Sequence, residues 1–262
     1  MHVRSAGDLD WSVLICLLGG FRLLKAGQEV ELRIGGKSQA LLSNLALRAQ
    51  YGYPREVLLA ALWPEADASL AGESLNSLVY RLHRLLGDAL DGRAPVVYAN
   101  ECYWLNTNAG VGVDVAVYDA LVRIGNEHVR AGDRAAAVDT YGRAIRLYHG
   151  DLCSDGDVYA VMESERLRNQ HSALLAYLAE QHFADGDYAA CLERAFALLA
   201  HDPCREDVHR LVMRCYVRRG ERARALRQYR LCESILRSEV DAVPERATLA
   251  LFEQVRLTPD NV

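Results

Sequence analysis

The first half of the chain combines short β-type patterns with helical patterns. Residues 11–24 are rich in Val, Leu, Ile and Phe, and apolar residues alternate with polar ones over residues 30–34, which predicts a small N-terminal sheet. Apolar residues then recur at three- and four-residue steps, as expected when one side of a helix is buried. This spacing predicts helices at residues 37–48, 55–62 and 69–87.

A hairpin is expected after the third of these helices. Residues 95–98 and 103–105 are β-rich pieces, and residues 99–102 lie between them. A short sheet, three helices and a hairpin, in that order, form a winged helix. We therefore predict that residues 1–112 fold as a winged helix-turn-helix domain with a small β-sheet and a wing hairpin.

From Val113 onward the strand patterns stop and helical patterns continue. We expect further helices at residues 115–130, 134–148, 159–184, 188–200, 206–219, 221–238 and 244–256. Three of the boundaries pair a glycine with a following acid, at Gly132, Gly186 and Gly220, because glycine allows a left-handed helix exit and an acid suits the next helix start. The last two glycines are 34 residues apart, which is the tetratricopeptide period. The predicted fold class is mainly α, with a TPR-like helical repeat domain over residues 113–262.

The helix at residues 69–87 carries the candidate chemistry of the first domain. Its apolar positions share one side, and its polar side offers hydrogen-bonding groups and guanidinium groups of the kind that read base edges and phosphates. A water-facing helix surface has a similar composition, so the pattern alone leaves both interpretations open. The candidate DNA-binding residues are Asn76, Ser77, Tyr80, Arg81 and Arg84.

The overall charge gives no general attraction to nucleic acid. The 262 residues carry a formal net charge of -5 with a pI near 5.9, and residues 1–110 contain ten Lys and Arg against eleven Asp and Glu. Any attraction to DNA must therefore come from local patches.

The cysteines and histidines favour packing over metal binding. Seven cysteines are scattered without a CxxC pair, so we expect reduced thiols and no disulfide framework. His201 and Cys204, with His209 and Cys215 nearby, could meet a metal on one helical face, but ordinary packing is favoured without a second close ligand pair. We expect no metal and no cofactor, and the sequence contains no catalytic spacing that would indicate an enzyme.

The apolar run at residues 11–24 is too short to cross a bilayer and follows two acids rather than a basic leader. We therefore expect a cytoplasmic protein without membrane contact.

An arginine-rich segment lies in the second half of the chain. Residues 205–237 hold ten arginines and four acids, and Arg210, Arg214 and Arg218 follow the four-residue spacing of one helix face. This face could contact DNA, or it could dock the acidic stretch at residues 151–165 in the same or a neighbouring chain. Solvated arginines on a repeat surface are an equally good interpretation.

Several segments together carry a family resemblance: Ala61-Leu62-Trp63, the helix that ends in Arg81-Leu82-His83-Arg84, and Asp114-Val115-Ala116-Val117-Tyr118 at the domain junction. The chain resembles the Streptomyces antibiotic regulatory protein (SARP) type of transcriptional activator over nearly its whole length. Its first half is similar to the winged-helix DNA-binding domain of response regulators, and its second half to the bacterial transcriptional activator domain.

The resemblance implies how such a protein would work. It implies that the third helix enters the major groove of double-stranded DNA, with the hairpin over the adjacent minor groove, and that a homodimer binds direct repeats. It also implies contact with RNA polymerase through the face around the second helix and the loop at residues 63–68.

Two functions from different classes remain open at this level. The first is a sequence-specific DNA-binding transcriptional regulator, with an activator favoured over a repressor, whose helical half serves self-association or signal input. The second is a protein-interaction adaptor, in which the winged helix no longer binds DNA and the repeat groove holds a peptide or partner protein.

Overall fold

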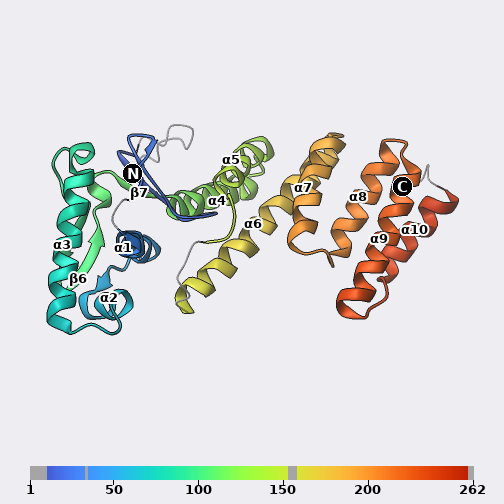
Figure 1. Cartoon of the computed structure of the whole chain (residues 1–262). Helices are drawn as coiled ribbons and strands as arrows, with labels where there is room; N and C mark the ends of the chain where they lie inside the picture. Colours follow the sequence, from blue (N-terminus) through green and yellow to red (C-terminus); the bar gives the residue numbers. More distant parts are fainter. Residues whose placement is uncertain (1–10, 33–34, 153–157, 259–262) are drawn as a thin grey trace. The chain divides into compact units, whose positions relative to one another are not determined.

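The structure is a computed structural model that describes residues 11–32, 35–152 and 158–258. Contacts divide the chain into two compact units, Met1–Arg168 and Asn169–Val262. The first unit contains two small sheets and several helices, and the second consists of helices (Figure 1). Together they confirm the predicted class, a mainly α protein with a small N-terminal β component.

The first sheet contains four short strands in the order β3-β2-β1-β7. Their bounds are Val13–Cys16 for β1, Arg22–Lys25 for β2, Gln28–Glu29 for β3 and Val111–Val113 for β7. Strand β1 is buried along its whole length, which agrees with its unbroken apolar sequence. It pairs antiparallel with β2 and parallel with β7, a strand that the sequence pattern did not predict.

The strand predicted from the alternation over residues 30–34 is absent over residues 30–32, the part of it that the structure describes. The chain turns earlier, at Ala26 and Gly27, whose φ angles are 48° and 78°, so the third strand is exposed β3. These positive angles belong to the tight two-residue turn that joins β2 to β3. Val30 only donates one backbone hydrogen bond to the Leu23 carbonyl, and Ile34 lies outside the described residues.

Three helices pack next to the sheet, and all three were predicted within two residues. They are α1 (Gly35–Leu47), α2 (Arg55–Leu62) and α3 (Ala68–Leu86). Their apolar sides meet in one core because the buried leucines recur at helical spacing. The fully buried members of this core include Leu41, Leu42, Leu45, Leu58, Leu62, Leu75, Leu82 and Leu86.

A second sheet contains the predicted hairpin, in the order β4-β6-β5. Its strands are β4 (Tyr53–Pro54), β5 (Val96–Ala99) and β6 (Cys102–Leu105), and 3-10 turns η1 (Gly87–Leu90) and η2 (Thr107–Ala109) flank the hairpin. Asn100 and Glu101 form its two-residue turn with φ angles of 51° and 60°. The hairpin therefore confirms the wing, with one addition, the short strand β4 that pairs with β6.

A buried carboxylate joins the first sheet to the helices that follow. Asp114 begins α4 (Asp114–Arg130) and is 3% exposed. Its oxygens accept hydrogen bonds of 2.8–2.9 Å from the backbone N–H groups of Leu17, Leu18 and Val115. Burial raises the pKa of Asp114, and these three hydrogen bonds oppose that rise. Helix α4 is thus fastened to the end of β1.

Helix α4 forms a hairpin with α5 (Arg134–Leu147), and both belong to the first compact unit. Gly132 has a φ of 73°, and the Asp133 carboxylate accepts a hydrogen bond from the Ala136 N–H at the start of α5. The compact units divide within α6 (Val158–Ala184), whereas the predicted domain boundary lies at residues 112 and 113. The two divisions differ because β7 and Asp114 tie the first helical hairpin to the sheet.

The second unit continues as antiparallel helices. They are α7 (Tyr188–His201), α8 (Glu206–Arg218), α9 (Arg222–Val240) and α10 (Arg246–Leu257), and they follow one another side by side in chain order (Figure 1). Gly186 and Gly220 have φ angles of 77° and 74° at two helix ends, as predicted for left-handed exits. Met213 and Val255 lie in the core shared by α8, α9 and α10.

Candidate nucleic-acid interface

Helix α3 has one buried and one exposed side. The buried side includes Leu75, Leu82 and Leu86, each less than 1% exposed. All of the predicted DNA-binding side chains are on the exposed part of the helix: Asn76, Ser77, Tyr80, Arg81 and Arg84. Tyr80 is 63% exposed, an unusual amount for a tyrosine in a well-packed helix. The structure therefore brings the predicted candidates together on one surface.

The two arginines of α3 form no ion pair with a carboxylate among the described residues. Arg81 donates from Nε to the Ser77 carbonyl over 3.3 Å, and no carboxylate lies within ion-pair distance of Arg81 or Arg84 in the described ranges. Ion pairs occupy many other arginines of the chain: Arg123, Arg143, Arg166, Arg168, Arg194, Arg205, Arg210, Arg219, Arg224, Arg237 and Arg256. Each of the two guanidinium groups of α3 can thus donate hydrogen bonds to an anion or to a base edge.

Contacts at both ends fix the position of α3. At its start, the Asp67 carboxylate accepts a hydrogen bond of 2.9 Å from the Ser69 N–H. At its end, the Lys25 amino group donates to the Leu85 carbonyl over 2.9 Å and pairs with Asp88 at 2.7 Å. The hydrogen bond from Lys25 lowers the pKa of Asp88. The exposed face of α3 therefore rests on a supported helix.

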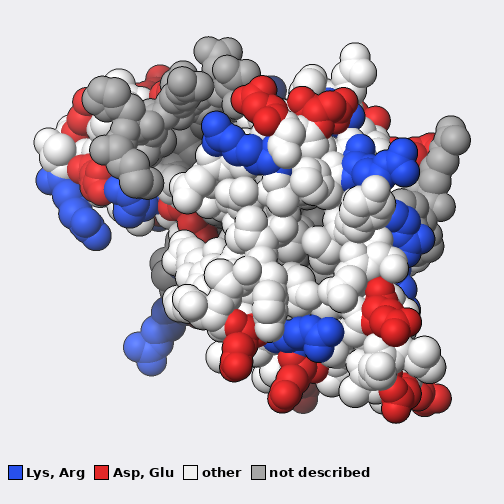
Figure 2. Space-filling model, turned by 90° about the vertical axis from the view of Figure 1, so that its left-hand side faces the viewer, with Lys and Arg blue, Asp and Glu red and all other residues white. Residues whose placement is uncertain are grey.

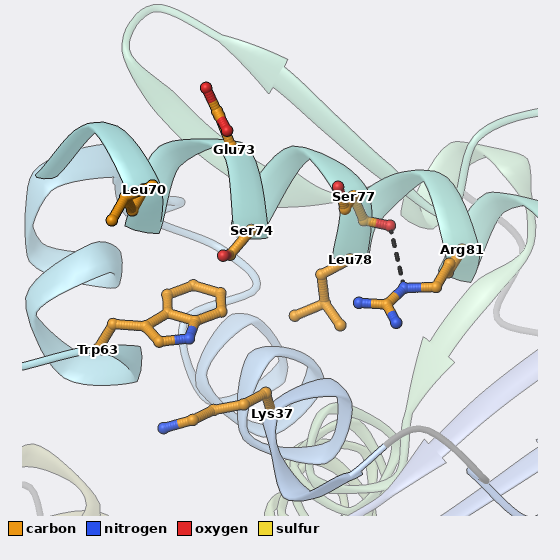
Figure 3. A pocket seen from close by; sticks show the side chains of 8 residues that line it. All are labelled: Lys37, Trp63, Leu70, Glu73, Ser74, Ser77, Leu78 and Arg81. Atoms are coloured by element: carbon orange, nitrogen blue, oxygen red, sulfur yellow. Dashed lines mark hydrogen bonds between the residues drawn. The ribbon is translucent and has the colours of Figure 1, made fainter. Parts of the chain in front are cut away.

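One flank of α3 borders a shallow groove of about 480 Å³ (Figure 3). Ser77 and Arg81 line it, and the Arg81 guanidinium points along the groove toward Leu78 rather than straight away from the helix. The full lining consists of Lys37, Trp63, Leu70, Glu73, Ser74, Ser77, Leu78 and Arg81. Asn76, Tyr80 and Arg84 do not line it, so the predicted residues divide between the outer face and the groove.

The floor of the groove comes from residues outside the predicted DNA-binding set. The Lys37 amino group donates to the Leu62 carbonyl at the end of α2 and lies 5.9 Å from the centre of the Trp63 ring. Trp63 is half-buried and lines the groove. Leu70 is 63% exposed. Only the tertiary packing of α1 and α2 beneath α3 brings these side chains together.

The wing hairpin is aromatic and carries no basic side chain over residues 96–105. The rings of Tyr98 and Tyr103 lie 4.8 Å apart, and Tyr103 is buried while Tyr98 is 53% exposed. The Trp104 indole donates to the Ala99 carbonyl over 3.3 Å, which braces the turn. The ring contact and the indole hydrogen bond both lie within the hairpin itself.

The surface around α3 has mixed charge. Figure 2 views the protein from the side where α3 lies in Figure 1, and its centre is uncharged, with basic and acidic side chains spread around the edges. This agrees with the near balance of charges over residues 1–110. Long-range attraction to a polyanion is therefore weak, and recognition must depend on a few well-placed contacts.

One of the three arginines of the predicted face, Arg210, Arg214 and Arg218, already forms an ion pair within the chain. Arg210 pairs with Glu245 at 3.0 Å and donates to the Thr248 hydroxyl at 2.8 Å, so it holds α10 against α8. Arg214 and Arg218 remain exposed. Any partner or DNA patch on this face therefore depends on these two arginines.

The acidic stretch at residues 151–165 is internally neutralised where the structure describes it. Asp151 and Glu165 both pair with Arg168, at 2.6 and 2.5 Å, and Glu163 pairs with Arg166 at 2.6 Å. Asp155 and Asp157 lie outside the described residues. The described carboxylates thus already have arginine partners close to them in the chain.

The proposed metal alternative does not form in the described ranges, where no group of three His, Cys, Asp or Glu side chains could hold an ion. His209 Nε2 lies 2.9 Å from the Pro203 carbonyl and its Nδ1 lies 2.7 Å from Gln228 Nε2. Cys215 instead contacts Cys191, with the sulfurs 3.3 Å apart. Among the helices that the structure describes, none combines the length and apolar character of a membrane span.

Comparison with known proteins gives the family. The model of the bacterial transcriptional activator domain matches residues 113–256. The regulatory protein AfsR of Streptomyces coelicolor is 27% identical over 254 residues, which are 96% of this chain and 24% of AfsR. The transcriptional regulatory protein MoaR1 of Mycobacterium tuberculosis is 22% identical over 97% of this chain and 81% of its own.

A solved structure has the same fold. Mycobacterium tuberculosis EmbR, in complex with a low-affinity phosphopeptide, superimposes with a TM-score of 0.74 at 24% identity, covering 94% of this chain and 65% of that one. The chain spans about a quarter of the length of AfsR. Because the matched domain covers more than half of its residues, this protein belongs to the bacterial transcriptional activator domain family, and it is similar to SARP-type transcriptional regulators.

Proposed function

We propose that this protein binds double-stranded DNA with the exposed face of α3 in the major groove and activates transcription from promoter repeats. One observation carries the proposal: hydrogen-bonding side chains and two arginines without a carboxylate partner gather on the exposed side of a helix whose other side is buried. An α-helix fits the major groove, where side chains can distinguish all four base pairs. The regulator names of the relatives support the same function.

The residues of α3 take different roles in this proposal. Arg84 contacts a phosphate or a guanine from the outer face, because a guanidinium group presents two parallel donors. Asn76 and Tyr80 lie on the same face and reach base edges or phosphates. Arg81 and Ser77 contact the DNA backbone from the border of the protein groove that Lys37 and Trp63 line. The hairpin lies over the adjacent minor groove, where the exposed Tyr98 supplies contact without charge.

Two copies bind together in this proposal. A near-neutral DNA-binding surface supplies few phosphate contacts, and a homodimer on direct repeats multiplies the affinity of each copy. The helical repeat domain serves the self-association or receives a signal.

We propose further that RNA polymerase contacts the side of α3 that borders the protein groove lined by Lys37 and Trp63. Trp63 and Leu70 offer exposed apolar surface there, next to the loop at residues 63–68. Aromatic and apolar side chains are better suited to contact a protein partner than to contact a phosphate backbone.

The DNA-binding proposal is tested on a duplex that the full chain selects from a randomised pool. In a mobility-shift titration, Arg84→Ala should weaken binding roughly tenfold or more and flatten the dependence of log K on log salt by about one. Arg130→Ala is the matched control, since Arg130 is an exposed arginine at the end of α4. If the wild-type protein selects no duplex even at low salt, the adaptor function is the better account.

The polymerase proposal needs a separate readout. Trp63→Ala should leave the affinity for the selected duplex within about twofold and lower run-off transcription from a promoter that contains it. Equal losses in binding and transcription would instead assign Trp63 to the packing of the winged helix.

A further inference from the structure

A third arginine lies beside α3 and was not marked by the sequence pattern. Arg55 is the first residue of α2, and its backbone N–H donates to the Glu101 carbonyl in the wing turn over 3.0 Å. Its side chain is half-buried and extends to α3. Arg55 therefore stands where α2, the wing hairpin and α3 come together.

The contact with α3 depends on a glycine. Gly72 is buried in the second turn of α3, and a Cβ atom built on it would lie 2.6 Å from Nη2 and 3.5 Å from Cζ of Arg55. A real Cβ atom essentially never lies that close to another heavy atom, so any other side chain at position 72 would require the flexible end of Arg55 to shift. Glycine lowers helix stability relative to alanine. Gly72 therefore leaves room for the Arg55 guanidinium group against α3.

The location of Gly72 places Arg55 next to the DNA-facing residues. Gly72 precedes Asn76 by four positions, so the two lie on the same flank of α3, one turn apart. Neither residue lines the groove of Lys37 and Trp63, which borders α3 on its other flank. Arg55 thus extends the polar face of α3 toward the wing.

The charge of Arg55 has no counterpart in the described residues. No carboxylate lies within ion-pair distance of it, although Glu56 and Glu73 are near in sequence to Arg55 and Gly72. Partly burying a guanidinium group costs desolvation free energy, and here no ion pair offsets that cost. The planar N–H donors of the group match the geometry of a phosphate.

We propose that Arg55 binds a phosphate group of the DNA backbone and that Gly72 positions it. This inference rests on the proposed function, since it adds a contact to the surface that α3 presents to DNA. It assigns the wing-side flank of the helix a charged contact that the hairpin itself, without a basic residue, does not supply. Backbone contacts of this kind fix the orientation of a reading helix on the duplex.

The test uses the full chain and the duplex selected by the wild-type protein. Arg55→Ala should weaken binding roughly tenfold at about 150 mM salt and flatten the salt dependence by about one. Arg55→Lys should keep the salt dependence and recover part of the affinity, because lysine retains the charge without the planar fork. Arg130→Ala should change neither quantity.

Gly72→Ala separates a positioning role from a structural one. Alanine favours the helix, so the melting temperature should stay the same or rise, while the added methyl group displaces the guanidinium group and weakens DNA binding roughly three- to tenfold. The double variant should bind no worse than Arg55→Ala, because both substitutions remove the same contact. A variant that is merely misfolded would lose stability and binding together.

The outcomes distinguish this inference from the proposed function. If Arg84→Ala flattens the salt dependence and Arg55→Ala does not, Arg55 is no phosphate contact and the inference is overturned. Normal binding by Gly72→Ala would likewise overturn the positioning role of Gly72. If the wild-type protein binds no duplex, the proposed function fails and this inference fails with it.

Discussion

Asp114 gives the sharpest test of how the two halves of the first unit are joined. Its carboxylate is 3% exposed and accepts hydrogen bonds from the backbone N–H groups of Leu17, Leu18 and Val115. Two of these donors follow β1, which is almost one hundred residues earlier in the chain. Replacing the carboxylate changes all of these contacts at once.

The magnitude follows from the number of donors. A buried donor left without a partner costs about 1–3 kcal/mol. Asp114→Asn keeps one carbonyl oxygen, so one or two of the three donors lose their acceptor and face an amide NH₂ group instead. We expect the free energy of unfolding to fall by about 2–4 kcal/mol, a large part of the stability of an ordinary domain.

Urea unfolding at pH 7, followed by circular dichroism, measures this change. Asp119→Asn is the matched control on the same helix: Asp119 pairs with Arg166 at the surface, where both side chains are about 40% exposed. Its loss should cost at most about 1 kcal/mol. If Asp114→Asn costs no more than Asp119→Asn, the carboxylate does not fasten α4 to the sheet.

Three further predictions concern the wing and the second unit. Glu101→Gly should stabilise the protein by about 0.5–1 kcal/mol in thermal unfolding, because Glu101 has a φ of 60°, a backbone conformation that strains any residue but glycine. An unchanged or lower stability would show that position 101 is not strained. Burial, with smaller contributions from His201 and Arg194, lowers the pKa of His171 to about 4. The wild-type protein should therefore lose stability as the pH falls from about 6.5, the ordinary histidine pKa, through 4, and His171→Leu should lose less over that range; parallel pH profiles would contradict this. Arg210→Ala should cost about 1–2 kcal/mol in urea unfolding, whereas the exposed Arg214→Ala should stay within about 0.5 kcal/mol, and equal effects would refute the docking role of Arg210.

The helices could be predicted because their apolar spacing is long and regular. The predicted bounds of α2 match the structure, and those of α3 differ by one residue. The short strands β4 and β7 have only two and three residues, too few to show a period of two. The alternation over residues 30–34 had that period, but the positive φ angles at Ala26 and Gly27 start the third strand earlier.

The candidate site was only partly visible in the sequence. The exposed face of α3 follows from helical spacing, so Asn76 and Arg84 could be identified. Arg55 and Lys37 could not, because each reaches α3 or the end of α2 from another element. The same limit applies to Arg210: its spacing matches an exposed helix face, but its side chain pairs with Glu245, the residue just before α10.

A photo-crosslinking amino acid at position 80 tests the central claim most directly. Tyr80 is 63% exposed at the middle of the outer face of α3, and Phe196, which is 43% exposed on α7, provides the control position. With the selected duplex and ultraviolet light, we predict a protein–DNA crosslink from position 80 that maps within the repeat, and none from position 196. A crosslink from position 196 but not from position 80, at saturating duplex, would contradict the entry of α3 into the DNA groove.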